Sequence, residues 1–214
     1  MKIQKLPILF LLLITNFIVS ELNSQINNVI SIKVGNNIIT SVDIQNAIIT
    51  NLIINNIEIN QENINKNKNY AVKNLINNII RRVEVKKYKI EDYNKKDLKA
   101  YIDGVAKQLS TDVQGLKQLF DSNGIDYNLF VENYRTKLQW NTLIFKIYKN
   151  QTNVNVVDVE NEVAKIKENK SKEEIEEIKK SVLNKKTEEK LSLFSRSHFS
   201  NLESSTLINF KWIN

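Results

Sequence analysis

The sequence predicts a mainly α-helical bundle that carries a small antiparallel β-sheet. Residues 29–39 form two β-branched runs on either side of Gly35-Asn36-Asn37, a pattern typical of a β-hairpin. Most of the following chain repeats apolar residues at spacings of three and four, as helices do. Residues 205–212 again alternate apolar and polar residues. Because an isolated hairpin is marginal in water, we expect residues 207–212 to pair with it.

The first helix is expected directly after the hairpin. Thr40 and Asp43 have the spacing of a capping box, and Ile44 begins a wide apolar face. The Asn-rich stretch 59–69 has little apolar content, so it is predicted to loop out. A second helix is then expected over residues 72–83, where apolar residues repeat at three and four.

Three further helices are expected before residue 150. Asn94 is a candidate cap for the third, and Ser110 or Thr111 for the fourth. Gly124 can adopt the left-handed conformation that ends a helix. The next helix is predicted over residues 127–148, and its second half is apolar nearly all round. We therefore expect that half to be covered on more than one side.

The last third of the chain is predicted to return along the bundle. Residues 154–157 indicate a short extended link, and Asp158 is a candidate cap for the helix that follows. A charged segment then continues as helix through Val182, and further helical turns reach Leu202. The mixed charges of this segment are typical of a solvated helix face.

The amino-terminal residues resemble a secretory signal. Lys2 and Lys5 precede an apolar run over residues 6–19, and Ser20 or Ser24 supplies a small residue at a cleavage point. Residues 1–20 are therefore predicted to be a signal peptide, with cleavage as late as residue 24. The alternative is an uncleaved membrane anchor, although the run is shorter than the ~20 residues that span a bilayer.

Composition argues against several functional classes. Without cysteine there is no disulfide, thiolate metal site or cysteine nucleophile. The net charge is +7, but the lysines lie among acids and no glycine-rich aromatic motif accompanies them, which argues against nucleic-acid binding. Phosphate-binding loops, HExxH pairs and nucleophile elbows do not occur.

We expect no catalytic residue, cofactor or metal. His198 is interpreted as a helix-packing residue, and Ser195 and Ser197 lie at the wrong offsets for a triad.

The order of these features resembles the SurA family of periplasmic chaperones and peptidyl-prolyl isomerases. In that family a hairpin leads into a helical bundle, and a helix and strand return at the carboxyl end. The segments that carry the resemblance here are residues 32–44, 71–90, 116–140, 155–163 and 185–210.

The resemblance implies one chaperone domain over residues 21–214. Residues 150–170 correspond to the exit segment where the family normally inserts parvulin isomerase domains, and residues 171–214 to the returning helix and strand. A parvulin domain takes on the order of a hundred residues, which do not fit here. Parvulin sites also use glycine-rich loops and paired histidines, whereas this chain has four Gly and one His. The protein is therefore predicted to be non-enzymatic.

The resemblance also implies a periplasmic holdase that binds unfolded polypeptides, namely outer-membrane β-barrel proteins, in an apolar groove with polar flanks. Candidate client-binding residues are Phe120, Tyr127, Phe130 and Tyr134. The alternative is that all four belong to the core, since apolar stripes usually face inward. A structural or assembly subunit that binds one fixed partner, or a swapped homodimer, is the second hypothesis, and a peptidyl-prolyl isomerase the third. No stable membrane insertion is expected after signal cleavage.

Overall fold

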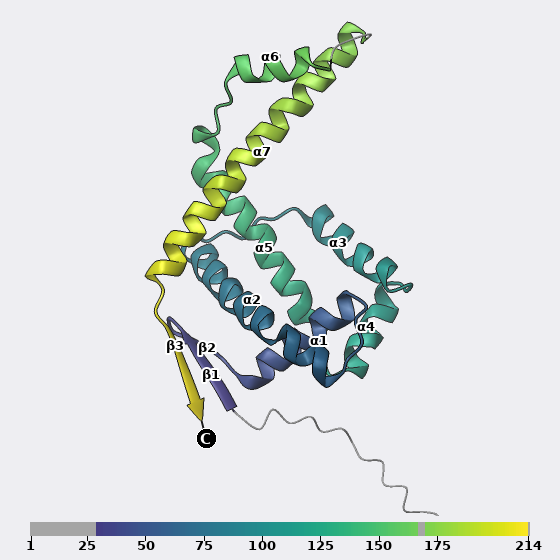
Figure 1. The fold of residues 1–214 in the computed structure, drawn as a ribbon, viewed down its shortest axis with the longest axis vertical. Helices are drawn as coiled ribbons and strands as arrows, with labels where there is room; N and C mark the ends of the chain where they lie inside the picture. The colour runs from purple at the N-terminus through teal and green to yellow at the C-terminus, as the bar shows by residue number, and fades with distance from the viewer. Residues whose placement is uncertain (1–28, 167–169, 214) are drawn as a thin grey trace, which may run out of the picture.

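The computed structural model describes residues 29–166 and 170–213, so the predicted signal peptide lies outside the described residues. A helical body carries a three-stranded sheet at one end and a helical arm at the other (Figure 1). The predicted fold class, mainly α with a small antiparallel sheet, is confirmed. The elements are β1 (Val29–Val34), β2 (Asn37–Ile39), α1 (Ser41–Ile54), α2 (Gln61–Lys87), α3 (Lys95–Gln108), α4 (Val113–Ser122), α5 (Tyr127–Tyr148), the 3-10 helix η1 (Lys149–Gln151), α6 (Val156–Ala164), α7 (Lys172–Ser205) and β3 (Ile208–Ile213).

The sheet joins two segments from opposite parts of the sequence. Its order is β2-β1-β3, and both pairings are antiparallel. Gly35 takes a φ of +56° in the hairpin turn, and its N–H donates to the carbonyl of Leu207 at 2.9 Å. Val34 lies opposite Ile208 in the register with β3. The predicted pairing of the carboxyl-terminal strand with the hairpin is confirmed, with β1 at the centre.

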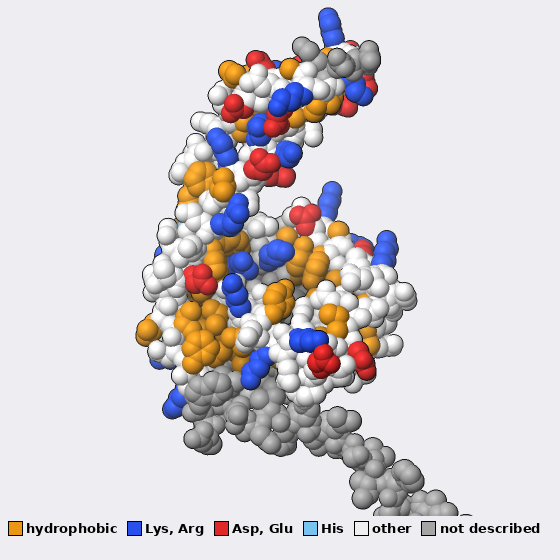
Figure 2. Space-filling view, in the orientation of Figure 1, with side chains coloured by type: hydrophobic (Ala, Val, Ile, Leu, Met, Phe, Trp, Pro, Cys, Tyr) orange, Lys and Arg blue, Asp and Glu red, His pale blue; other side chains and the backbone are white. Residues whose placement is uncertain are grey.

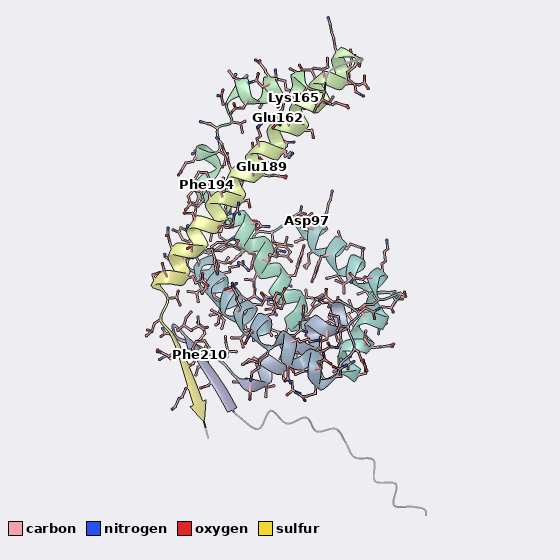
Figure 3. The ribbon with its side chains drawn as sticks, viewed as in Figure 1. Asp97, Glu162, Lys165, Glu189, Phe194 and Phe210 are labelled. Carbon is pink, nitrogen blue, oxygen red and sulfur yellow. The ribbon has the colours of Figure 1, made fainter. Side chains whose placement is uncertain are left out.

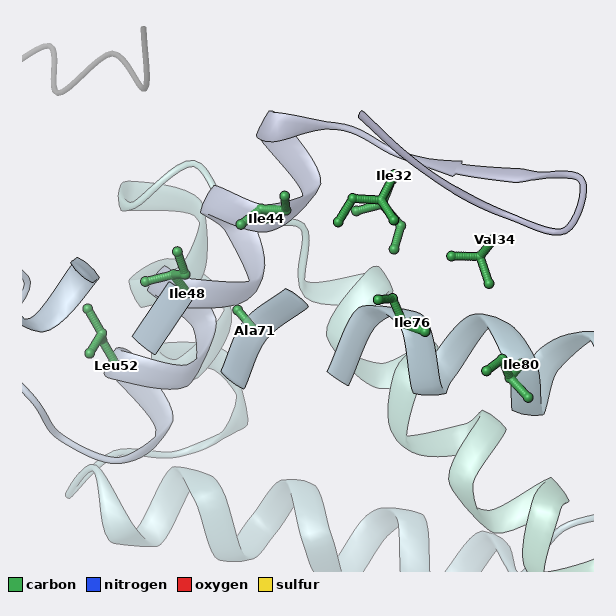
Figure 4. Packing of buried hydrophobic residues seen from close by; sticks show 9 residues of the cluster. Ile32, Val34, Ile44, Ile48, Leu52, Ala71, Ile76 and Ile80 are labelled. Carbon is green, nitrogen blue, oxygen red and sulfur yellow. The ribbon is translucent and has the colours of Figure 1, made fainter. Parts of the chain in front are cut away.

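The inner face of the sheet packs on α1 and α2. Ile32 and Val34 are 0% and 1% exposed, and Ile39 of β2 is buried beside them. They share one apolar cluster with residues of the two helices, shown in Figure 4: Ile44, Ile48, Leu52, Ala71, Ile76 and Ile80. The helix layer therefore supplies the apolar support that a hairpin lacks in isolation.

The prediction of a loop over residues 59–69 is wrong. Helix α2 begins at Gln61, and the Asn-rich stretch forms its first turns. The Asn60 side chain caps this end by accepting from the Asn63 N–H at 3.0 Å. Asn51 of α1 donates to the Asn67 side chain at 2.8 Å, which fastens the stretch to the neighbouring helix. Asparagine therefore stabilises this end through capping and interhelical hydrogen bonds, despite its low helix propensity.

Helices α3, α4 and α5 enclose a second apolar cluster around Phe120, which is 0% exposed. Asn94 caps α3 as predicted, and its side chain accepts from the N–H of Lys96. Helix α4 is capped by Asp112 and not by Ser110 or Thr111, because the Asp112 carboxylate accepts from the Gly115 N–H at 2.8 Å. Gly124 has a φ of +68° after α4, as expected.

Helix α5 has the predicted bounds, and its second half is covered on two sides. Trp140, Leu143 and Ile144 are buried in a cluster with Val85 of α2, with Ile90 just after that helix, and with Leu191 and Phe199 of α7. The indole Nε1 of Trp140 donates to Ser195 Oγ at 2.8 Å.

His198 of α7 packs at the same junction. Its Nδ1 lies 2.9 Å from the Tyr148 hydroxyl, and its Nε2 lies 3.4 Å from a carboxylate oxygen of the buried Glu84. Its ring also meets the indole of Trp140 edge to face, with centroids 5.5 Å apart. This agrees with its interpretation as a helix-packing residue.

The arm consists of α6 and the first half of α7, which fold back on each other (Figure 1). Helix α7 has 34 residues and at 1.5 Å per residue spans about 50 Å. Helix α6 is capped by Asn155, whose side chain accepts from the Val157 N–H at 3.0 Å; the predicted cap, Asp158, lies in the first turn instead. Lys186 donates to Glu162 at 3.0 Å across the arm, where Figure 3 labels Glu162.

Within the described ranges, no helix combines the length and the apolar character required to cross a membrane.

Candidate functional site

A cleft of about 520 Å³ opens on the body between α1, α2 and α5. Ile38 and Ile39 of β2 border it, and Tyr101 of α3 contributes to its wall. We call this cleft the groove. Figure 2 shows that Lys and Arg side chains gather between hydrophobic side chains on one face of the body. The groove combines the same two kinds of side chain with asparagine amides.

Regular helical spacing builds the α2 wall of the groove. Tyr70, Asn74, Asn78 and Arg82 are four residues apart and form one continuous stripe, since residues at that spacing share a helix face. Leu75 and Ile79 form a parallel apolar stripe beside it. The other walls follow the same spacing, with Asp43, Asn46, Ala47, Thr50, Asn51 and Ile54 on α1 and Leu129, Phe130, Asn133, Tyr134 and Lys137 on α5.

Tyrosine rings form the aromatic part of the wall. The rings of Tyr101 and Tyr134 are stacked with centroids 3.6 Å apart, and Phe130 lies 5.7 Å from Tyr101. Burial raises the pKa of the Tyr101 hydroxyl, and the nearby Tyr134 and Tyr70 raise it further. Tyr70 remains 56% exposed at the rim. Such rings offer apolar contact area together with a polar end.

Asparagine amides supply the polar part of the wall. Asn51 is bonded to Asn67, and Asn133 accepts from Arg82 Nη2 at 3.2 Å. The side chains of Asn46, Asn74 and Asn78 make no hydrogen bond to another described residue. An amide both donates and accepts, so it can pair with the N–H or C=O groups of a polypeptide backbone, whatever side chains that polypeptide carries.

The charged residues of the groove fall into two groups. Asp43 and Asp126 serve as helix-capping partners: the Asp43 carboxylate accepts from the Thr40 N–H at 2.7 Å, and that of Asp126 from the Asn128 N–H at 2.8 Å. The three cations, Arg81, Arg82 and Lys137, form no ion pair with any residue that the structure describes. With three cations and two carboxylates, the lining of the groove has a net charge of +1, and its cations have no directly paired anion among the described residues.

The structure separates the four candidate client-binding residues. Phe130 and Tyr134 line the groove. Phe120 of α4 is fully buried in the cluster that this helix forms with α3 and α5, and it does not line the groove. Tyr127 is half-buried, packs on the same cluster and lies outside the groove, with the Lys117 ammonium 5.2 Å from its ring centroid. A client-binding role for Phe130 and Tyr134 stays a prediction.

Most of the groove was not predicted from sequence. The stripe of Tyr70, Asn74, Asn78 and Arg82 has a readable four-residue period, and this signal could have indicated a polar functional face beside the apolar one. Where α1 and α5 meet that stripe depends on tertiary packing.

In the parts of the chain that the structure describes, no three His, Cys, Asp or Glu side chains lie close enough to hold a metal ion. The groove combines aromatic and aliphatic contact surface, amides able to bond to a backbone, and cations that form no ion pair within the described part of the chain.

No family model matches the chain, and no curated protein matches it. One similar solved structure comes from a study of the virulence factor PEB4 and the periplasmic protein Cj1289, two structurally related SurA-like chaperones of Campylobacter jejuni. The TM-score is 0.39 and the identity 17%, over 87% of this chain and 100% of that chain.

Proposed function

We propose that the protein is a periplasmic chaperone of the holdase type, which binds extended, unfolded polypeptides in the groove without catalysis. The observation that carries the proposal is the composition of the groove. Its amides can pair with a polypeptide backbone, and its tyrosines and aliphatic residues can contact varied side chains. Such contacts do not require a defined client sequence.

The position of β2 is consistent with an extended client. This strand is at the edge of the sheet, so one side of its backbone is not paired by another described strand. Its residues Ile38 and Ile39 border the groove, and Ile38 is largely exposed. Unpaired strand edges are surfaces to which extended chains add by backbone hydrogen bonding.

The sequence resemblance to the SurA family supports the proposed location and client class. We propose that the protein acts in the periplasm after removal of its leader, and that its clients are unfolded outer-membrane β-barrel proteins. The strands of such proteins alternate apolar and polar residues. One face of such a strand would contact the tyrosine wall while the other faces the amides.

The proposal is tested by aggregation of a urea-unfolded outer-membrane β-barrel protein after dilution, followed by light scattering with and without the chaperone. Asn78→Trp fills part of the groove and should abolish the suppression of aggregation. Asn69→Trp is the matched control, because Asn69 is exposed on the same helix and does not line the groove. Both variants should keep the helical circular dichroism of the parent.

Two results would count against the proposal. If Asn78→Trp and Asn69→Trp suppress aggregation equally well, client binding lies outside the groove. Binding of one protein at fixed stoichiometry, with no effect on several unfolded polypeptides, would favour an assembly subunit instead.

A further inference from the structure

We propose that the groove selects extended client segments rich in acidic side chains, whose carboxylates pair with Arg82 and Lys137. The inference rests on the proposed function and names the class of segment that the groove prefers. It follows from the charges of the groove and from the way in which its acidic residues are already engaged.

The acidic residues of the groove are used within the fold. Asp43 accepts from both the N–H and the hydroxyl of Thr40 at 2.7 Å, and Asp126 caps α5. Carboxylates at helix amino termini are also stabilised by the positive end of the helix dipole. Neither therefore serves as the counter-ion of Arg82 or Lys137, with which no ion pair is formed.

The two cations are held by contacts that leave their charge uncompensated. Arg82 donates to the neutral amide of Asn133, and its buried Nε–H has no partner in the described chain. The Lys137 ammonium lies 5.5 Å from the ring centroid of Tyr134, a contact that positions the cation without neutralising it. A carboxylate entering the groove would form charge-assisted hydrogen bonds that the protein itself does not supply.

Arg81 adds positive charge to the same wall. Its guanidinium carbon lies 5.0 Å from the ring centroid of Phe199 of α7, so it also serves packing. Burial lowers the pKa of Arg81, because its charged form has lost part of its hydration. A nearby anion would restore some of that lost stabilisation. Its packing role makes Arg81 unsuitable for a test by substitution.

Arg82 and Lys137 project from two different helices, which favours side chains of an extended segment over a single chain end. Along a strand, side chains on one face recur every ~7 Å, so one segment presents several carboxylates in a row. A free carboxyl terminus supplies only one. We therefore assign the preference to Asp and Glu side chains.

The test uses fluorescent peptides of about ten residues, ~33 Å when extended, with blocked termini. Three versions share tyrosine, serine and valine positions and differ only in carrying Glu, Gln or Lys at the remaining positions. Dissociation constants are measured by anisotropy at low ionic strength. We expect the Glu peptide to bind about tenfold more tightly than the Gln peptide, as two modest ion pairs would give. Raising the salt should reduce this preference.

The double variant Arg82→Gln/Lys137→Gln should bind the Glu and Gln peptides equally, so that the ratio of their dissociation constants falls from about ten to about one. The matched control is Lys172→Gln/Lys180→Gln, which removes the same charge from exposed positions on α7. It should keep the full preference, because those lysines do not line the groove.

The outcomes separate this inference from the proposed function. If none of the three peptides binds the parent protein, both the inference and the proposed function are contradicted. Equal binding of the Glu and Gln peptides by the parent overturns the acidic preference and leaves the holdase proposal intact. The acidic preference is also overturned if Arg82→Gln/Lys137→Gln still prefers the Glu peptide, or if Lys172→Gln/Lys180→Gln no longer does. If a Gln peptide with a free carboxyl terminus binds tenfold more tightly than the blocked Gln peptide, the groove binds chain ends instead, and the inference is wrong.

Discussion

Removing β3 should destabilise the body although α7 is left intact. The cut is placed after Thr206, because the Thr206 hydroxyl donates to the Leu202 carbonyl and completes the end of the helix. The truncation turns β1 from the central strand into an edge strand, and it removes the bond from the Gly35 N–H to Leu207. What remains of the sheet is a two-stranded hairpin.

The magnitude follows from what β3 contributes. Ile208 is half-buried against the sheet cluster, which is worth about 1 kcal/mol, roughly half the value of full burial. The exposed Leu207 and Phe210, at 68% and 58%, add little. Backbone pairing along the six-residue strand adds ~0.5–1.5 kcal/mol per bond, and the entropy of ordering the strand offsets most of it. We expect a loss of about 2–4 kcal/mol.

The assay is thermal unfolding followed by circular dichroism at the helical band. In a chain of this size, a loss of that order lowers Tm by about 5–15 °C. Size-exclusion chromatography should also detect self-association through the exposed edge of β1. The control is Phe210→Ser in the full chain, which keeps the strand and should leave Tm nearly unchanged. A truncated protein with the parent's Tm would refute the reasoning, because the hairpin would then not depend on β3.

Three further predictions concern the core, the arm and catalysis. Phe120→Ala should cost about 3–5 kcal/mol in urea unfolding, because the side chain is fully buried; unchanged stability with lost client binding would instead make Phe120 a site residue. The hydrogen bond from Lys186 lowers the pKa of Glu162, so its contribution is complete above the ordinary glutamate value of about 4.3 and is lost as pH falls through the lower folded pKa. After correction for the intrinsic exchange rate, the α6 amides of the parent should be better protected than those of Glu162→Gln at neutral pH, and this difference should disappear in acid. A difference that is the same at every pH would exclude this linkage. Finally, the protein should not accelerate prolyl isomerisation, which takes tens of seconds uncatalysed, and an acceleration that tracks protein concentration would contradict the non-enzymatic reading.

The sequence correctly predicted those helices and strands whose ends are determined by residues at the ends themselves, such as capping residues. The capping box of Thr40 and Asp43 formed as expected, and α5 has the predicted bounds. The pairing of β3 with β1 was also predictable, because a hairpin without support requires a partner. Two caps were misplaced by one to three residues, since a neighbouring Asp112 or Asn155 competed for the same role.

The remaining errors come from tertiary contacts. Asn67 keeps the start of α2 helical through its bond to Asn51 on another helix, and no local pattern indicates that bond. Phe120 and Tyr134 belong to similar aromatic stripes, yet Phe120 of α4 is enclosed by residues of α3 and α5, whereas Tyr134 lines the groove. Which side of a stripe stays open depends on how three helices meet, which the spacing within one helix cannot specify.

The central place of β1 has a consequence for the order in which the protein folds. Its partners in β3 lie roughly 180 residues later in the chain, a very long loop closure that slows the final step of folding. During synthesis, β1 emerges long before β3 exists, so the sheet cannot be completed until the last described strand has been made. Until β3 has been made, β1 therefore keeps an unpaired edge, to which the strand of another chain could add.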